Sequence, residues 1–260
     1  MLWLGVGLAV FLSVAMAFAC RTALSSGRSG RIDAIWTLST GAAGVIAALW
    51  PTADAQPARQ ALAAILIAVW SLRLGTYMWR RAESGPDDPR YATMKREWGE
   101  AAPARLFRFL QAQALCSWPL VAAVFVAAHA PRAAPDWRDA AAVALFCLAL
   151  GLESVADAQM AAFRRDPRNR GRICDTGLWA WSRHPNYFFE WLVWWTWPLI
   201  AIQMDHAAGW VALAAPALMY WLLAHVSGVP PLEAELRRSR PEAFADYERR
   251  VSRFFPAPPG

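Results

Sequence analysis

Long runs of apolar residues, separated by short polar segments, dominate the chain. Seven of them approach the length of about 20 residues that a helix needs to cross a bilayer. They cover residues 2–22, 33–50, 60–79, 106–129, 138–160, 187–204 and 209–227. The second run is short and carries Asp33, and the second half of the fifth is polar. The pattern predicts one all-α membrane domain over residues 1–260, built as a bundle of seven transmembrane helices.

The composition agrees with an integral membrane protein. The chain has 260 residues, of which 57% are hydrophobic and only 18% charged. Many of its 16 tryptophans stand near the ends of apolar runs, as expected for aromatic belts at the lipid–water boundary. The net charge of +6 comes from arginines in the loops, so it indicates orientation in a lipid membrane rather than binding to nucleic acid.

Arginines alternate between successive loops. They are abundant after the first, third and fifth runs and in the tail, whereas the remaining loops hold only Arg59, Arg132 and Arg138. By the positive-inside rule, this places the N-terminus outside and the C-terminus in the cytoplasm, with the protein in the inner (cytoplasmic) membrane. The first run has no basic residues before it, so we interpret it as a span rather than a cleaved signal peptide.

Polar residues of several runs fall at the same, cytoplasmic depth. Many stand four residues apart and so share a helix face. Such groups are costly inside a membrane, which makes them candidates for function. We therefore expect a polar cavity that opens to the cytoplasm. The residues concerned are Asp33, Arg73, Tyr77, Glu153, Asp157, Asn186 and Glu190, with Glu233 after the last run.

The cavity would contain arginines, which suit phosphates, and carboxylate and amide groups, which suit ribose hydroxyls or a carboxamide. The sequence has no G-x-G-x-x-G, no Walker A motif and no H-E-x-x-H. Its four histidines have no close spacing, so we expect no metal site. The four cysteines are scattered and are expected to be buried, unpaired side chains.

The segment from Gly177 to Trp191, with its Arg-His-Pro-Asn-Tyr core, resembles the signature of a large group of bacterial membrane proteins that belong with the steroid 5-alpha-reductases. The core is also similar to the corresponding stretch of sterol reductases. Further matches lie at residues 31–36, 71–77 and 226–233. The resemblance covers residues 30–257. It implies seven membrane helices, NADPH held on the cytoplasmic side, and hydride delivery to a carbon–carbon double bond conjugated to a ketone.

Position by position, the resemblance implies that the cofactor contacts are Asp157, Arg164, Arg172, Asn186 and Glu190, with Arg73, Tyr77 and Arg90 from the third helix and the loop after it. We add Glu153 and Glu233 to this predicted cofactor site. The steroid enzymes polarise the substrate ketone with a Glu and a Tyr, but here tryptophans stand near those positions. Asp33 and Tyr77 are the nearest substitutes, and we assign them the catalytic role. The expected substrate is a hydrophobic steroid-like or isoprenoid molecule drawn from the bilayer.

Two alternatives stay open. Membrane methyltransferases of the isoprenylcysteine and phospholipid type also show Arg-His-Pro-x-Tyr before a late helix, followed by a Glu pair and an aromatic tail. Glu233, Glu235, Tyr247 and Phe255 resemble that arrangement, in which the cavity would hold S-adenosylmethionine. A non-catalytic lipid carrier or scaffold is the other alternative, but apolar helices without a polar cavity would be its signature.

Overall fold

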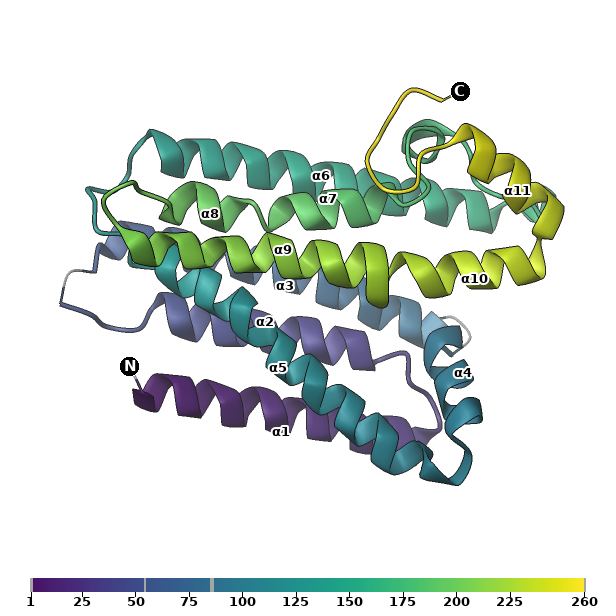
Figure 1. Cartoon of the computed structure of the whole chain (residues 1–260), viewed down its shortest axis with the longest axis horizontal. Coiled ribbons are helices and arrows are strands. Elements are labelled where there is room, and N and C mark those ends of the chain that lie inside the picture. The colour runs from purple at the N-terminus through teal and green to yellow at the C-terminus, as the bar shows by residue number, and fades with distance from the viewer. Residues whose placement is uncertain (1, 54, 85–86, 260) are drawn as a thin grey trace. The chain divides into compact units, whose positions relative to one another are not determined.

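A computed structural model describes residues 2–53, 55–84 and 87–259, and this part of the chain is helical apart from its connections (Figure 1). The α-helices are α1 (Leu2–Ser26), α2 (Ile32–Ala48), α3 (Pro57–Ser84), α4 (Pro89–Trp98), α5 (Ala102–Ala128), α6 (Trp137–Arg165), α7 (Pro185–Val193), α8 (Thr196–Ala201), α9 (Ala214–Trp221), α10 (Val229–Ser239) and α11 (Pro241–Arg250). Short helices of other types are η1 (Gly99–Ala101), η2 (Pro167–Asn169), η3 (Gly177–Ala180), η4 (Ala207–Leu213) and the π-helix η5 (Leu222–Val226). The prediction of an all-α fold is confirmed for the described residues, which form no β-strand.

Five helical stretches are long and apolar enough to cross a membrane. They are Leu2–Ser26, Pro57–Glu83, Arg90–Ala128, Trp137–Arg165 and Ala207–Ser239. The protein is therefore a membrane protein with transmembrane helices. The second predicted span is the 17-residue helix α2, which is shorter than these five.

The sixth predicted span is not one continuous helix. It is divided into α7 and α8, with Trp194 and Trp195 in a turn between them. Pro198 has no N–H group, so it cannot donate the helical hydrogen bond to the carbonyl of Trp194, four residues earlier. The hydropathy of the run is unaffected by this missing donor, which explains why a continuous helix was expected.

The contacts group the chain into two compact units. Unit 1 comprises Met1–Asp139 and Ile200–Ala214, and unit 2 comprises Ala140–Leu199 and Ala215–Gly260. In unit 1, α2 packs against α1, α3 and α5. In unit 2, the π-helix η5 packs against α10.

Glycines let α2 and α3 approach each other closely. A Cβ atom at Gly41 of α2 would lie 2.1 Å from the Cβ atom of Ser71 on α3, and one at Gly75 of α3 would lie 2.7 Å from the side chain of Leu38. Small residues at such positions are a common way to pack helices within a membrane, where no hydrophobic effect drives them together. The pair is consequently held by close van der Waals contact.

An ion cluster closes one end of unit 1 around the guanidinium of Arg59, whose side chain is fully buried. All five of its N–H donors have acceptors: both oxygens of Asp139, at 3.1 and 2.9 Å, and the carbonyls of Ala130, Arg132 and Ala133. Burying an arginine is costly unless every donor is paired, and here the pairing is complete. Arg59 therefore fixes the start of α3 to the loop before α6.

Candidate functional site

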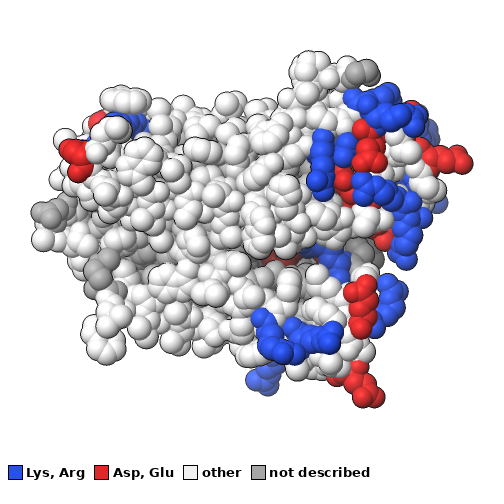
Figure 2. Space-filling view, viewed as in Figure 1, with Lys and Arg blue, Asp and Glu red and all other residues white. Residues whose placement is uncertain are grey.

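A buried carboxylate organises the polar part of unit 2. Glu233 of α10 is 1% exposed, and its Oε1 accepts from Nε of Arg183 at 2.9 Å and from Nε2 of His184 at 3.2 Å. Its other oxygen lies 3.3 Å from Nη2 of Arg237 and 3.5 Å from Nε of Arg253. Blue and red side chains gather over α10 and α11 in Figure 2. Both oxygens of Glu233, predicted to bind a cofactor, are thus engaged by neighbouring basic groups.

The same contacts tie the tail of the chain to the Arg-His-Pro-Asn-Tyr motif. The guanidinium of Arg183 also donates to the carbonyl of Val251 at 2.8 Å, and the hydroxyl of Ser182 donates to the carbonyl of Phe254 at 2.9 Å. The ring of His184 stacks on that of Tyr187, with centroids 5.7 Å apart. Burial lowers the pKa of His184 below its ordinary value, although the neighbouring carboxylate opposes the shift. The motif is therefore fixed in position by its contacts with α10 and with the tail of the chain.

The segment before this motif is fixed to α6. Gly177 has a positive φ of 62°, and a Cβ atom there would lie 2.6 Å from the side-chain amide of Gln159. The oxygen of that amide accepts from the N–H of Leu178 at 2.9 Å. The hydroxyl of Tyr247 on α11 donates to the carbonyl of Trp179 at 2.6 Å. Burial raises the pKa of Tyr247 well above its ordinary value, which keeps the hydroxyl protonated as a donor.

Helices α6 and α7 of unit 2 place four polar residues in a buried or half-buried environment. Glu153, Asp157 and Glu190 are buried, with 2%, 6% and 5% exposure. Nδ2 of Asn186 donates to Oδ1 of Asp157 at 3.3 Å, and Nε1 of Trp194 donates to Oε1 of Glu190 at 3.0 Å. The four polar residues were all predicted to bind the cofactor, and the structure joins two of them, Asn186 and Asp157, by a hydrogen bond.

The remaining predicted arginines differ in their surroundings. Arg164, in the last turn of α6, and Arg172, in the loop after it, are exposed at the same end of unit 2 as the motif. In unit 1, the guanidinium of Arg73 lies over the ring of Tyr77, 5.7 Å from its centroid, with both residues half-buried on α3. Exposed guanidinium groups remain accessible to a phosphate, and a cation over an aromatic ring is stabilised by the charge distribution of the ring.

Asp33 of unit 1 accepts hydrogen bonds from α4. The hydroxyl of Tyr91 donates to its Oδ1 at 2.8 Å, and Nη2 of Arg90 forms a close ion pair with its Oδ2. Among the described residues, these two are its side-chain partners, so Asp33 is engaged by Tyr91 rather than by Tyr77. Arg90 also contacts Asp88, the N-cap of α4. Burial raises the pKa of Asp88, but the hydrogen bonds and charge of Arg90 outweigh this and leave it below its ordinary value.

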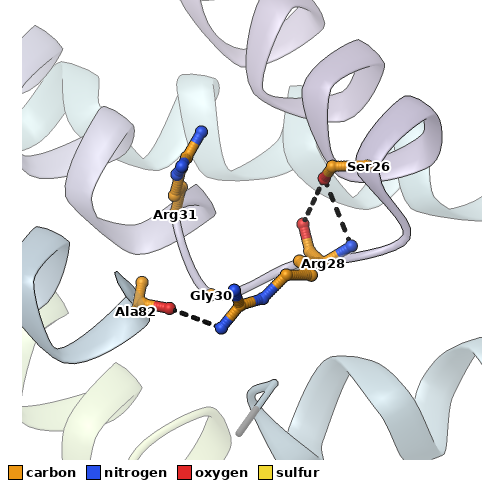
Figure 3. Close-up of a pocket in the computed structure, with 5 residues that line it drawn as sticks. All are labelled: Ser26, Arg28, Gly30, Arg31 and Ala82. Carbon is orange, nitrogen blue, oxygen red and sulfur yellow. Dashed lines mark hydrogen bonds between the residues drawn. The ribbon is translucent and has the colours of Figure 1, made fainter. Parts of the chain in front are cut away.

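A small pocket lies beside the loop between α1 and α2 (Figure 3). It is lined by Ser26, Arg28, Gly30, Arg31 and Ala82, and Nη2 of Arg28 donates to the carbonyl of Ala82 at 2.9 Å. Its volume of about 20 Å³ accommodates roughly one water molecule. The pocket is therefore too small for a nucleotide or a lipid.

The family model described as "Protein of unknown function (DUF1295)" matches residues 18–251 of the chain, which include Asp33, the motif and Glu233. The chain belongs to this family. It is also 26% identical over 228 residues to the "Uncharacterized protein C594.04c" of Schizosaccharomyces pombe (strain 972 / ATCC 24843). That alignment covers 76% of the chain and 63% of the yeast protein, so the chain spans less than two thirds of its relative. No solved structure matches the chain.

Two residues of these clusters are not among the site residues predicted from the sequence. Tyr91 follows Arg90 in a polar helix, and only the fold brings its hydroxyl to Asp33. His184 was noted in the motif but was given no partner, because Glu233 stands 49 residues later. A buried acid and a buried base at such separation leave no periodic signal in the sequence.

Proposed function

We propose that this protein is an NADPH-dependent membrane reductase that acts on a carbon–carbon double bond conjugated to a ketone in a steroid-like or isoprenoid lipid. The observation that carries the proposal is the buried polar group of α6 and α7, above all the hydrogen bond from Asn186 to Asp157. It is energetically costly to place a carboxylate and an amide on apolar helices, so we expect these side chains to serve a function. The resemblance to steroid 5-alpha-reductases and sterol reductases supplies one at these positions.

The chemistry of these side chains fits a dinucleotide. Among the described residues, the amide oxygen of Asn186 accepts no hydrogen bond, so it remains available to a ribose hydroxyl or a carboxamide. Arg164 and Arg172 are exposed and offer bidentate donors to phosphates. When bound, NADPH would supply the hydride. The chain's own contribution would be to hold the nucleotide, to keep water out with apolar helices and to stabilise the charge that develops on the ketone oxygen.

We assign the groups at the ketone to Asp33 and Tyr77, as the sequence suggests, and add Tyr91 as a positioning residue. Tyr91 acts through Asp33, since its hydroxyl donates to that carboxylate. Asp33 can act as a proton donor only when its contact with Arg90 or with Tyr91 is broken, because both carboxylate oxygens are engaged. Tyr77 can donate its hydroxyl proton directly.

The proposed membrane arrangement has seven passes, with the N-terminus outside and the cofactor site in the cytoplasm. Five passes are the long apolar stretches, and the other two are α2 and the divided pair α7–α8. At 1.5 Å per residue, α2 would extend about 26 Å, slightly less than the hydrocarbon core. The loop arginines support this orientation, because the loops proposed to lie outside hold only Arg59, Arg132 and Arg138.

The rival is a membrane methyltransferase that binds S-adenosylmethionine near Glu233 and Glu235. Both oxygens of Glu233 already accept from basic side chains, and Glu235 pairs with Arg238 at 2.7 Å. The hydroxyl of Tyr247 is directed at a backbone carbonyl. A cationic cofactor would have to displace several of these contacts, which favours the reductase.

The test is thermal unfolding of the detergent-solubilised protein with NADPH or S-adenosylmethionine added. A ligand that binds only the folded state raises its stability by RT ln(1 + [L]/Kd). We expect NADPH to raise the Tm of the wild type but not that of Asn186→Ala. The matched control is Asn169→Ala, which removes an asparagine whose amide donates to the carbonyl of Phe163.

Stabilisation by S-adenosylmethionine alone would replace the reductase with the methyltransferase. A Tm that responds to neither ligand would contradict both the reductase and the methyltransferase proposals and would favour the non-catalytic lipid carrier. Equal NADPH stabilisation of wild type and Asn186→Ala would remove Asn186 from the cofactor site.

A further inference from the structure

Helix α5 contacts Tyr91 at two points, its ring and its hydroxyl. Phe109 and Gln113 stand four residues apart on α5, so they share one face of the helix. The ring of Phe109 meets that of Tyr91 edge-on, with centroids 6.3 Å apart. Nε2 of Gln113 donates to the hydroxyl of Tyr91 at 3.5 Å. Tyr91 is 3% exposed, so α5 helps to bury the side chain that donates to Asp33.

The main chain at Gln113 joins α5 to α2. Its carbonyl accepts from Nε1 of Trp36, on α2, at 3.3 Å and from the hydroxyl of Ser117 at 3.3 Å. The hydroxyls of Ser117 and Thr40, on α5 and α2, lie 3.0 Å apart and are buried. None of these contacts uses the amide of Gln113. The side chain can therefore be exchanged without removing them.

The amide of Gln113 leaves one buried polar atom unpaired. Its oxygen is buried and has no hydrogen-bond partner among the described residues. An unpaired buried acceptor destabilises a folded protein. Methionine has a similar length and no amide, so it would avoid this cost. The stability of the fold therefore does not account for an amide at this position, whereas the contact with Tyr91 does.

The same amide directs the hydroxyl proton of Tyr91. A tyrosine hydroxyl has one proton to donate, and its oxygen can also accept. Because an N–H of Gln113 is directed at this oxygen, the proton of Tyr91 is left for Oδ1 of Asp33, 2.8 Å away. With the amide turned by about 180°, its oxygen would compete with Asp33 for that proton.

We propose that Gln113 is a positioning residue of the reductase, which acts on Asp33 through Tyr91. This role rests on the proposed function, because it requires Asp33 to lie at the substrate ketone. Hydrogen bonds between catalytic groups are often long without substrate and shorten in its complex, which fits the distance of 3.5 Å between Gln113 and Tyr91. Loss of the amide should therefore slow turnover without unfolding the protein.

The experiment is a double-mutant cycle of Gln113→Met and Tyr91→Phe, made in the full chain and assayed in mild detergent with NADPH and a steroid enone. Gln113→Met alone should lower kcat about fivefold, the effect of one hydrogen bond, while the Tm stays the same or rises. In the Tyr91→Phe background, the same exchange should change kcat by less than about twofold, because the hydroxyl on which Gln113 acts is already absent.

The matched control is Gln111→Met, also on α5. The amide of Gln111 accepts from the hydroxyl of Ser13 on α1 at 2.7 Å and donates to the carbonyl of Ser13 at 3.2 Å. Both ends of this amide are paired, and both pairs lie away from Tyr91. The control should therefore lower the Tm and leave kcat unchanged, which is the reverse of the result expected for Gln113→Met.

Two outcomes would overturn the role of Gln113. One is an equal loss of kcat from Gln113→Met in both backgrounds, and the other is a loss of kcat that accompanies a lower Tm. A wild type that reduces no enone would instead overturn the reductase itself, and this role with it.

Discussion

The guanidinium of Arg183 donates to the carboxylate of Glu233 at 2.9 Å, with both side chains almost entirely buried. The pair joins the start of α7 to α10, across 50 residues of sequence. Arg183 also donates to the carbonyl of Val251, so the tail depends on the same side chain. A buried pair of this kind is costly to break, because removing one partner leaves the other charge without compensation.

Glu233→Gln should lower the free energy of unfolding by about 3–5 kcal/mol, since Arg183 would keep its charge in a buried place. Glu235→Gln is the control on the same helix, because Glu235 is 39% exposed and its pair with Arg238 lies at the surface. Its effect should stay within about 0.5 kcal/mol. Thermal unfolding in one detergent measures both. Equal losses for the two variants would contradict a structural role for Glu233.

Acidification should weaken the protein through His184. Burial lowers the pKa of His184 below the ordinary value of 6.5, so the unfolded chain binds a proton more readily than the folded one. Its contribution to stability is therefore complete above about pH 6.5 and is lost as the pH falls through the folded pKa. Glu233, Arg183 and Arg253 are the charged groups that face it.

The measurement is the Tm of wild type and His184→Gln between pH 5 and pH 8. The wild type should lose more stability on acidification than the variant, which retains a side chain able to donate to Glu233. Parallel curves would show that another group governs the acid response.

Gly41→Ala should loosen the contact between α2 and α3. The new Cβ atom would lie 2.1 Å from that of Ser71, so the helices would have to separate at a cost of about 1–3 kcal/mol. Gly7→Ala on α1 is the control, because a Cβ atom there meets nothing within 4 Å. Alanine favours helix over glycine by about 1 kcal/mol, so the control should be neutral or slightly stabilising. Thermal unfolding distinguishes the two, and a stable Gly41→Ala variant would contradict the close packing.

Asp33→Asn should reduce the turnover of an enone substrate more than it reduces NADPH affinity. The exchange keeps the size of the side chain but removes the acid that we place at the ketone. Tyr91→Phe removes only the hydrogen bond to Asp33, so it should have a smaller effect, on the order of tenfold in kcat. Steady-state kinetics together with NADPH titration separate the two quantities. An equal loss of turnover and affinity in Asp33→Asn would exclude Asp33 from catalysis.

Continuous hydropathy makes five long apolar stretches predictable, because the membrane requires about 20 apolar residues in each. The break between α7 and α8 and the short α2 are less visible, since helix continuity depends on backbone donors and on neighbouring helices. The contacts of the tail are harder still. Ser182 and Phe254 meet across 72 residues, and the acceptor is a backbone carbonyl that any residue type possesses.

The candidate site was also predictable only in part. The spacing of Asp157, Asn186 and Glu190 on helices reveals polar faces, and the resemblance assigns them a ligand. The partners of Asp33 depend on where α4 packs, which the sequence pattern does not determine. Tyr91 therefore emerges only from the fold, although it stands next to Arg90.

The contacts of Arg59 also have a consequence for the time at which they can form during synthesis of the chain. Asp139 follows Arg59 by 80 residues, so at about 5–20 residues per second the carboxylate emerges roughly 4–16 s after the guanidinium. Until then the start of α3 has neither the carboxylate nor the carbonyls of residues 130–133 to bind. The five contacts of Arg59 can therefore be complete only after α4 and α5 have been made and the first turn of α6 has been translated.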